Sequence, residues 1–477
     1  MSKFKKVLAG ALAGVMAVGA LAGCSDSGNK TSTSPSTTTS TSDETKTDTA
    51  KGFYDDVDTK DVKSIYFLNF KPESADKYKA IADKYKEETG IEVRIETAAS
   101  GEYEKKLTSE MAKTDPPTIF QINGPVGYQN WKEYCADVSG SKLYDLVADK
   151  SLAVKDGDGV YGIPYVVEGY GIIYNNAIMT KYFATEGAKA ASMDEINSFA
   201  KLKEVVEDMT AKKEELGIDG VFGSTSLKTG DDWRWQTHLM DLPLYYEFGA
   251  DGNAIVNCFD AKELEFKYAE NYQNIFDLYT NNSVTEKNLL GGKTVSDSMA
   301  EFADEKCAMI QNGSWAWGDI EKGGKVKAED VKYLPIYTGA EGEEKQGLCI
   351  GTENYFAINS EVDEATQKAS MDFLVWLFTS DYGKKAVVDD LGFVTPFTSF
   401  GENEKPSNPL AVELLAWSDK AASGDVKSVD WAFLGIPSEK WKSDFGAALL
   451  EYVQGQKDWT KVVDDAKTSW ATERAAS

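Results

Sequence analysis

The chain has 477 residues, 42% of them hydrophobic and 12% aromatic, with a formal charge of −27 at pH 7. This charge excludes nucleic acid and anionic lipid as binding partners, because both are bound by clustered Lys and Arg. His238 is the one histidine, which excludes histidine-rich metal sites and argues against a Ser-His-Asp or Cys-His nucleophile. The composition predicts a globular chain with no metal and no cofactor.

The N-terminus has the pattern of a secretory signal. Lys3, Lys5 and Lys6 precede an apolar run, residues 7–22, that is short for a permanent transmembrane helix. The run ends in Leu-Ala-Gly-Cys at residues 21–24, which resembles the bacterial lipobox. We therefore expect removal of residues 1–23 and diacylation of Cys24; the alternative is an ordinary signal peptide with an accidental cysteine.

A polar segment follows the predicted anchor. Residues 25–50 are mostly Ser and Thr and contain no Leu, Ile, Val, Met or aromatic residue. Such a segment cannot bury enough apolar surface to offset its ordering entropy. We assign residues 24–60 to a disordered linker. The remaining chain is too long for one core, which predicts two lobes.

The folded part begins with alternating strands and helices. Ser64–Phe70 reads as a buried strand, and Tyr78 to Tyr85 places apolar residues on one helix face that Gly90 ends. A strand with alternating Ile and Val follows, then a helix over 103–112 and a short apolar strand over 118–122. This order predicts an open parallel α/β sheet, whose ligands bind beyond the carboxyl ends of the strands.

Four cysteines follow Cys24, namely Cys135, Cys258, Cys307 and Cys349. They allow three disulfide pairings, and spacing does not choose among them. None shows the Cys-x-x-Cys spacing of zinc or thioredoxin-like sites. We expect buried free thiols.

Six segments together resemble the extracellular solute-binding proteins of ATP-driven importers, the class that includes the maltose-binding protein. They match the strand into the ligand cleft, the hairpin before the first crossing, two interlobe crossings, the segment with Gly-x-Trp and the C-terminal helix pair. In chain order, the strand is at residues 115–121, the hairpin at 159–165, the first crossing at 167–175, the Gly-x-Trp segment at 302–317, the other crossing at 391–396 and the helix pair at 452–465. The resemblance spans about residues 62–475.

The resemblance implies an α/β, two-lobed, periplasmic-binding-protein-like fold of the class II type. Residues 61–166 and 335–391 would form lobe 1, residues 167–334 and 392–477 would form lobe 2, and three crossings near Glu168, Leu334 and Val394 would act as hinges. The family function implies a monomer that carries carbohydrate to ABC importer permease subunits. It would be held on the extracellular face of a Gram-positive cell membrane by its lipid alone.

A sugar site needs aromatic planes for C–H faces and carboxylates or amides for hydroxyls. Trp315 follows a Gly-Ser turn, and in the family the matching tryptophan stacks on sugar; core packing is the alternative. The family's glutamate at the position of Glu168 contacts sugar, whereas a hinge ion pair is the other possibility in this apolar stretch. Tyr170 is a further candidate, and so is Asn123 at a strand end, unless it only forms an Asn-Gly turn.

The inserted segments 180–194 and 225–258 add further candidates. Two carboxylates beside two tryptophans at residues 231–235 suit an oligosaccharide subsite, or a cluster on the lobe surface. The remaining candidate ligand contacts are Asp232, Trp233, Glu353, Asn354 and Trp441, the last by its approximate match to a stacking position of the family. The Asp-Gly-Asp-Gly run at 156–159 lacks the rest of a calcium loop and predicts a hairpin turn.

Three functions remain open from the sequence. The first is capture of a carbohydrate, expected to be an oligosaccharide, without catalysis. The second is the same fold binding a polyamine, peptide or metal complex, which the acidic composition would suit. The third is a lipid-anchored glycoside hydrolase, which also uses Trp and paired carboxylates. The order of the family segments and the abundance of Trp favour carbohydrate capture.

Overall fold

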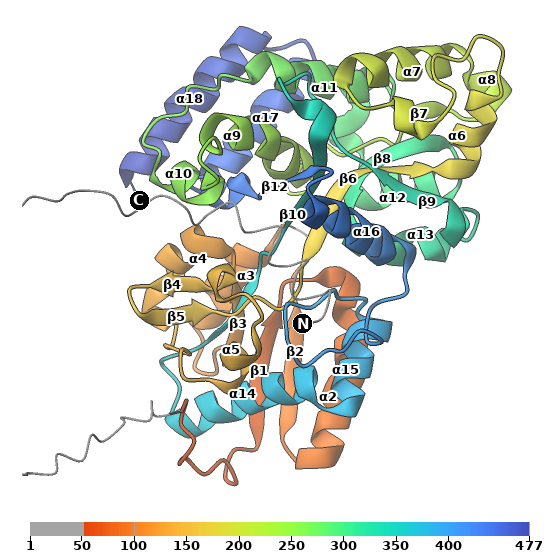
Figure 1. The fold of residues 1–477 in the computed structure, drawn as a ribbon. Helices are drawn as coiled ribbons and strands as arrows, with labels where there is room; N and C mark the ends of the chain where they lie inside the picture. Colours follow the sequence, from red (N-terminus) through yellow and green to blue (C-terminus); the bar gives the residue numbers. More distant parts are fainter. Residues whose placement is uncertain (1–51, 100, 477) are drawn as a thin grey trace, which may run out of the picture.

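The computed structural model describes residues 52–99 and 101–476, which form two lobes (Figure 1). The predicted signal peptide, Cys24 and the linker up to residue 51 lie outside the described residues. Residues 52–60, assigned above to the linker, pack on the first lobe. The Phe53 N–H donates to the Gly140 carbonyl over 3.0 Å, and the Phe53 ring packs against the lobe core. The linker prediction is wrong for this stretch because Phe53 supplies the apolar surface that residues 25–50 lack.

The first lobe is built on a four-stranded sheet with the order β11-β3-β1-β2. The first three strands in the chain are parallel, as predicted, and β11 is antiparallel to β3. The α2 helix (Ala75–Thr89) covers the sheet with Tyr78, Ile81 and Tyr85 and ends at Gly90, where φ is 78°. The strands are β1 (Ser64–Asn69), β2 (Glu92–Thr97), β3 (Ile119–Ile122) and β11 (Tyr355–Ile358).

Short helices and one hairpin complete this lobe. The hairpin at the predicted Asp-Gly turn joins two antiparallel strands. The elements are α2 (Ala75–Thr89), α3 (Tyr103–Met111), α4 (Gly124–Trp131), α5 (Lys142–Leu146), β4 (Val154–Asp156), β5 (Gly159–Gly162), α14 (Glu364–Thr379) and α15 (Asp381–Lys385).

The second lobe surrounds a sheet with the order β12-β10-β6-β8-β7, and β9 also pairs with β6. All eight residues of β6 are buried, because the strand lies at the centre of the sheet with helices around it (Figure 1). The strands are β6 (Glu168–Asn175), β7 (Gly220–Phe222), β8 (Cys307–Gly313), β9 (Val331–Leu334), β10 (Gln346–Gly351) and β12 (Lys427–Val429).

Helices of the second lobe come from the middle and the end of the chain. A π-helix, η5 (Arg234–Leu239), and a 3₁₀ helix, η11 (Ala432–Gly435), lie among them. The α-helices are α6 (Asn176–Phe183), α7 (Phe199–Ala211), α8 (Lys213–Leu216), α9 (Asp241–Phe248), α10 (Ala254–Asp260), α11 (Ala269–Asn281), α12 (Val295–Ala303), α13 (Trp317–Gly323), α16 (Pro409–Ser423), α17 (Glu439–Val453) and α18 (Trp459–Ala476).

Two of the predicted lobe boundaries differ from the structure. Beyond the boundary predicted at residue 335, β10 still pairs with β6, so the chain enters the first sheet only between Gly351 and Tyr355. Beyond the boundary predicted at residue 392, Phe397 and Phe400 still pack in the first lobe, and the chain joins the second lobe before Leu410. The apolar residues on both sides of each boundary hide the change of lobe from sequence patterns.

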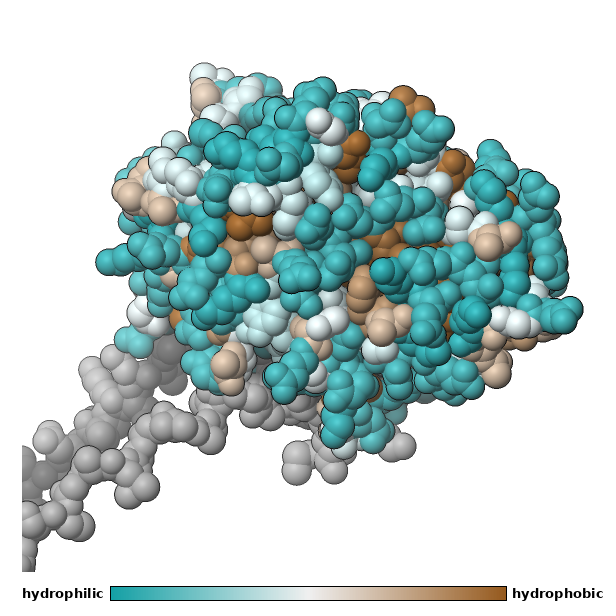
Figure 2. Space-filling model, turned by 90° about the horizontal axis from the view of Figure 1, so that it is seen from above, coloured by the Kyte–Doolittle hydropathy of each residue, from teal (hydrophilic) through white to brown (hydrophobic). Residues whose placement is uncertain are grey.

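The four described cysteines are buried and free, as expected. Within residues 52–99 and 101–476, no helix combines the length and the apolar character needed to cross a bilayer. Figure 2 views the molecule from above and shows a mainly hydrophilic surface with scattered apolar residues. This surface agrees with the formal charge of −27.

Candidate functional site

The lobes meet at a buried ion pair. Lys71 follows β1 in the first lobe, and its ammonium donates to both carboxylate oxygens of Glu168, at the start of β6, over 2.8 Å each. The two side chains are only 6% and 4% exposed. Burial opposes the charge on Lys71, but the carboxylates of Glu168 and Glu73 outweigh this effect and raise the pKa of Lys71. Of the two roles considered for Glu168, the structure shows the ion pair at the crossing.

An aromatic cluster lies on the second lobe beside this crossing. The Tyr170 ring, on β6, lies 4.4 Å from the His238 ring and 5.6 Å from the Trp431 ring, measured between centroids. The Trp315 ring lies 5.5 Å from His238 and 6.0 Å from Trp233. The structure therefore brings together three predicted residues, Tyr170, Trp233 and Trp315, and adds His238 and Trp431.

Local chain geometry holds Trp315 in this cluster. The residue lies in the turn after β8 and is half-buried. Its indole ring folds back over Gly313, where an added Cβ would lie 2.2 Å from the ring. Only glycine at 313 leaves room for this ring position. The Trp315 Nε1–H is buried without a hydrogen-bond partner.

A hydrogen bond from its hydroxyl fixes the position of the Tyr170 ring. Its hydroxyl donates to Asp241 Oδ2 over 2.7 Å, and Asp241 Oδ1 accepts the Phe433 N–H over 3.2 Å. Burial raises the pKa of Asp241 to about 8. Tyr170 itself is fully buried. Its ring therefore forms the buried side of the cluster, and its hydroxyl, already bonded to Asp241, is not free to bind a ligand.

Two polar side chains of the π-helix lie within the cluster. The Arg234 guanidinium lies 4.1 Å from the Trp233 ring centroid, and its Nε and one Nη have no partner. The His238 Nε2 is also buried and unpaired. Burial lowers the pKa of Arg234 to about 9 and that of His238 to about 3, the latter with a contribution from the Arg234 charge.

Further unpaired polar atoms lie where the lobes meet. Asn123 directly follows β3, and its Oδ1 is buried without a hydrogen-bond partner. The other lobe is close at this point, because a Cβ added to the neighbouring Gly124 would lie 3.4 Å from Leu434. Thr352 and Asn354, in the crossing from β10 to β11, also have unpaired buried oxygen or nitrogen atoms. Buried polar atoms are nearly always hydrogen-bonded in folded proteins. A group of unpaired ones from both lobes fits a polar ligand enclosed between them.

Glu353 lies in the same crossing and is half-buried. Burial raises its pKa to about 7; the Lys71 charge opposes this rise and the Glu168 charge adds to it. The charges of the buried ion pair thus act on this carboxyl group, and ligand contact by Glu353 stays a prediction. Such a group both donates and accepts hydrogen bonds near neutral pH.

The structure places two of the predicted contacts, Trp441 and Asp232, inside the second lobe. Trp441 is 0% exposed, stacks on Phe445 between α17 and α18, and donates its Nε1–H to the Ala466 carbonyl over 2.8 Å. Its amphipathic helix turns the indole into the lobe core, so it cannot reach a ligand between the lobes.

Asp232 has its Oδ1 bonded within the second lobe. That oxygen accepts the Gly230 N–H over 3.1 Å and the Gln236 amide over 2.8 Å, while the side chain packs against Gly446. Burial raises the pKa of Asp232 to about 6. This carboxyl group is buried and hydrogen-bonded inside the second lobe, so it does not lie in a cluster on the lobe surface.

Sequence reasoning missed several residues of the site. Arg234 belongs to the Trp-rich segment 231–235, but only its neighbours were candidates there. His238 lies three residues beyond that segment and stands out in the sequence only as the single histidine. Lys71 ends the first strand at the predicted ligand edge, so its position was available as a signal. Trp431 and Gln311 carry no such signal, because they reach the cluster through tertiary packing alone.

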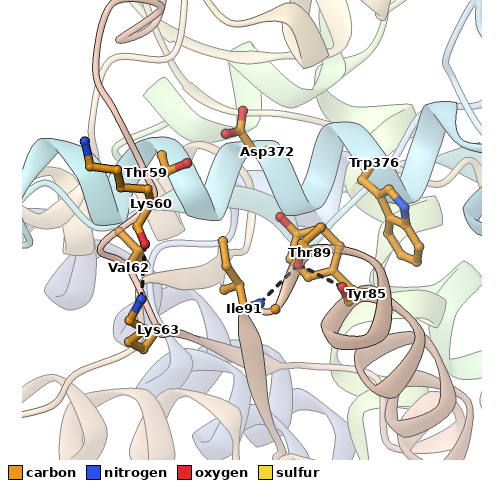
Figure 3. Close-up of a pocket in the computed structure, with 10 residues that line it drawn as sticks. Thr59, Lys60, Val62, Lys63, Tyr85, Thr89, Ile91, Asp372 and Trp376 are labelled. Carbon is orange, nitrogen blue, oxygen red and sulfur yellow. Dashed lines mark hydrogen bonds between the residues drawn. The ribbon is translucent and has the colours of Figure 1, made fainter.

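Figure 3 shows a pocket in the first lobe, formed by the segment before β1, the end of α2 and α14, and its volume is about 460 Å³. Its lining includes Lys60, Tyr85 and Trp376. The Thr89 hydroxyl there donates to the Tyr85 carbonyl and accepts the Ile91 N–H. None of the residues that line this pocket has a buried unpaired polar atom. The interface between the lobes is therefore the better candidate site.

Among the described residues, no group of three or more His, Cys, Asp and Glu side chains is placed to hold a metal ion. The unpaired atoms at the interface are amides, hydroxyls, indoles, a guanidinium and an imidazole. With the aromatic rings beside them, they are suited to a ligand that has both apolar faces and many hydroxyl groups.

Solved structures share this fold at low sequence identity. A raffinose complex of the binding protein RafE has a TM-score of 0.65 and 17% identity, covering 86% of this chain and 99% of that chain. A chitin oligosaccharide binding protein has a TM-score of 0.67 and 18% identity, covering 87% and 100%. A sugar transporter protein from Bacillus licheniformis in complex with stachyose has a TM-score of 0.62 and 16% identity, covering 86% and 100%.

These similarities agree with the two-lobed architecture and with the predicted fold class. A family model described as bacterial extracellular solute-binding protein matches residues 80–413, which is more than half of the chain. The chain belongs to the family of bacterial extracellular solute-binding proteins.

Proposed function

We propose that this protein captures an oligosaccharide between its two lobes and delivers it to an ABC importer without chemical change. The observation that carries the proposal is the cluster of Trp233, Trp315 and Trp431 beside unpaired buried polar atoms from both lobes. Indole rings pack on the C–H faces of sugars, and the polar atoms would bind hydroxyls. The similar structures named for raffinose, stachyose and chitin oligosaccharide support this ligand class.

The buried charges favour an uncharged ligand over a polyamine. The Lys71 charge is matched by Glu168, and Arg234 has unpaired donors but no carboxylate hydrogen-bonded to it in the described structure. A polycation would lie against the positively charged Arg234, and its ammonium groups could not accept hydrogen bonds from the guanidinium. A polyhydroxyl ligand accepts hydrogen bonds from this guanidinium and leaves the ion pair intact.

The direct test is a thermal-shift screen with raffinose, stachyose, chitotriose, xylotriose and maltotriose, with spermidine as the cationic control. A ligand that binds only the native state stabilises it by about 2.7 kcal/mol at a hundredfold excess over Kd. We expect at least one oligosaccharide to raise the melting temperature and spermidine to leave it unchanged. A response to spermidine alone would overturn the proposal.

Capture is proposed to involve closure of the lobes about the crossings at Glu168, at residues 352–354 and between Phe400 and Leu410. The lobes approach each other closely: an added Cβ at Gly101 would lie 2.2 Å from the Gly230 carbonyl oxygen. A ligand bound by both lobes stabilises the closed form over the open one. Small-angle scattering should therefore give a smaller radius of gyration with the oligosaccharide, and an unchanged profile at saturation would contradict hinge closure.

The proposed location is the outer face of the cell membrane, with Cys24 as the acylated residue. The supporting observation is the apolar run 7–22 that ends in Leu-Ala-Gly-Cys. Cys24→Ser should release the protein into the medium or leave it unprocessed, because the acyl chains supply the membrane affinity. Mass spectrometry of the wild-type protein should show a lipid-modified Cys24 as its first residue; an unmodified N-terminus elsewhere would rule out this anchor.

A further inference from the structure

Two buried side chains on one π-helix have polar atoms without partners. Arg234 is 2% exposed and His238 is 5% exposed. The unpaired atoms are Nε and one Nη of Arg234 and Nε2 of His238. Leaving such atoms unpaired in the protein interior is costly. Helices of this type occur frequently at functional sites, where they reposition side chains.

The hydrogen bonds around His238 determine which ring nitrogen carries the proton. The Thr237 hydroxyl donates its single hydrogen to the Trp233 carbonyl over 2.5 Å. The same hydroxyl oxygen lies 2.9 Å from His238 Nδ1. Since its hydrogen is already used, this oxygen accepts a hydrogen bond from Nδ1–H. Nε2 is therefore the bare nitrogen and acts as an acceptor.

The surroundings of His238 keep the ring neutral. Aromatic rings of Tyr170, Trp233 and Phe433 pack within 5.2 Å of it, between centroids. Burial lowers its pKa to about 3, and the charges of Arg234, Lys442 and Lys71 act in the same direction, whereas the Trp233 carbonyl opposes them. The Nε2 acceptor is therefore available throughout the pH range in which the protein would operate.

On the basis of the oligosaccharide function proposed above, we propose that Arg234 and His238 determine specificity by binding neighbouring hydroxyls of the sugar unit on Trp315. The Arg234 guanidinium donates to one hydroxyl oxygen, and the bare Nε2 of His238 accepts the hydrogen of the other. Neighbouring hydroxyls supply an acceptor and a donor close together, which matches this pair of side chains. The unit bound here is an uncharged sugar with both hydroxyls free.

The same geometry disfavours an acidic sugar. A carboxylate would accept hydrogen bonds from Arg234, but it has no hydrogen to donate to Nε2 of His238. The lone pairs of its oxygen would therefore face the lone pair of Nε2. The carboxylates of Asp231 and Asp319 already act electrostatically on Arg234. A further negative charge beside them would be repelled.

The single histidine makes this proposal testable by nitrogen NMR. A chain purified without a histidine tag and labelled with ¹⁵N-histidine gives the ring signals of His238 alone. Without ligand, we expect a protonated Nδ1 and a bare Nε2, unchanged between pH 8 and pH 5. Adding the oligosaccharide that raised the melting temperature most should shift Nε2 and leave Nδ1 in place.

A protonated Nε2, or an Nε2 signal that does not move at saturating oligosaccharide, would overturn the proposal while leaving oligosaccharide capture intact. Failure of every oligosaccharide to bind would overturn capture and, with it, this assignment. The outcomes therefore separate the two inferences.

Two variants at the same position provide a second measurement. His238→Phe keeps a ring against Tyr170 and Phe433 but removes the acceptor, so affinity should fall about tenfold, the loss expected for one hydrogen bond. His238→Gln retains an acceptor and should recover part of that affinity. A purely structural role would instead lower the melting temperature without ligand and show no such recovery. Tighter binding of an analogue that carries a uronic acid would assign Arg234 to a carboxylate and overturn the hydroxyl pair.

Discussion

Replacing Trp315 by Ala is expected to weaken oligosaccharide binding about 100-fold. An indole stacked on a pyranose removes roughly 100 Å² of apolar surface from water, which is worth about 2.5 kcal/mol at ~25 cal/mol per Å². At ~1.4 kcal/mol per decade, this is close to two decades in Kd. Because Trp315 is half-buried, part of its surface is available to a ligand. Titration calorimetry on the wild-type and variant proteins measures the change directly.

The matched control is Trp441→Ala, which removes the same side chain from the core of the same lobe. Trp441 is 0% exposed and its Nε1–H is bonded to Ala466. Its loss should cost about 3–5 kcal/mol of stability and leave the affinity of the folded protein nearly unchanged. Intact affinity in Trp315→Ala, or a loss of stability as large as that of the control, would place Trp315 in the core and remove it from the site.

Replacing Lys71 by Met is expected to destabilise the protein by about 3–5 kcal/mol, the usual result of breaking a buried ion pair from one side. The variant leaves the Glu168 carboxylate buried without its cation, and the side chain is only 4% exposed. Chemical denaturation followed by tryptophan fluorescence measures the loss. Sugar binding should weaken as well, because Glu168 lies at the first crossing between the lobes.

The double variant Lys71→Met with Glu168→Leu tests the cause. Removing both charges should restore most of the stability, since the buried carboxylate is gone. Lys105→Met is the surface control, because the Lys105–Glu102 pair is 78% and 49% exposed, and it should change stability by less than about 1 kcal/mol. A double variant as unstable as Lys71→Met alone would show that lost packing, and not the unpaired charge, is responsible.

Sequence patterns predicted the first lobe more closely than the second. The strands over 64–69, 92–97 and 119–122 follow from local alternation and helix boundaries, and they appear in the predicted parallel arrangement. The second sheet could not be predicted in this way. It joins β12 from residues 427–429 to β10 and β6 through contacts between distant parts of the chain.

Residues of the candidate site could be predicted only where the short segment that contains them has a recognisable pattern of its own. Tyr170, Trp233 and Trp315 lie together in the structure, and each belongs to a segment with its own signal in the sequence. The resemblance places Trp441 near a stacking position of the family, and the burial of its helix face could not be read from the sequence. The ion pair of Lys71 with Glu168 joins residues 97 positions apart, so no local pattern indicates it.

A crystal structure of the wild-type protein with the oligosaccharide that raises its melting temperature most is the most direct test of the whole account. We expect a sugar ring against Trp315, enclosed by both lobes, with hydroxyls at Arg234 and His238 and with the Lys71–Glu168 pair intact. A sugar bound elsewhere, for example in the pocket beside Tyr85 and Trp376, would contradict the account.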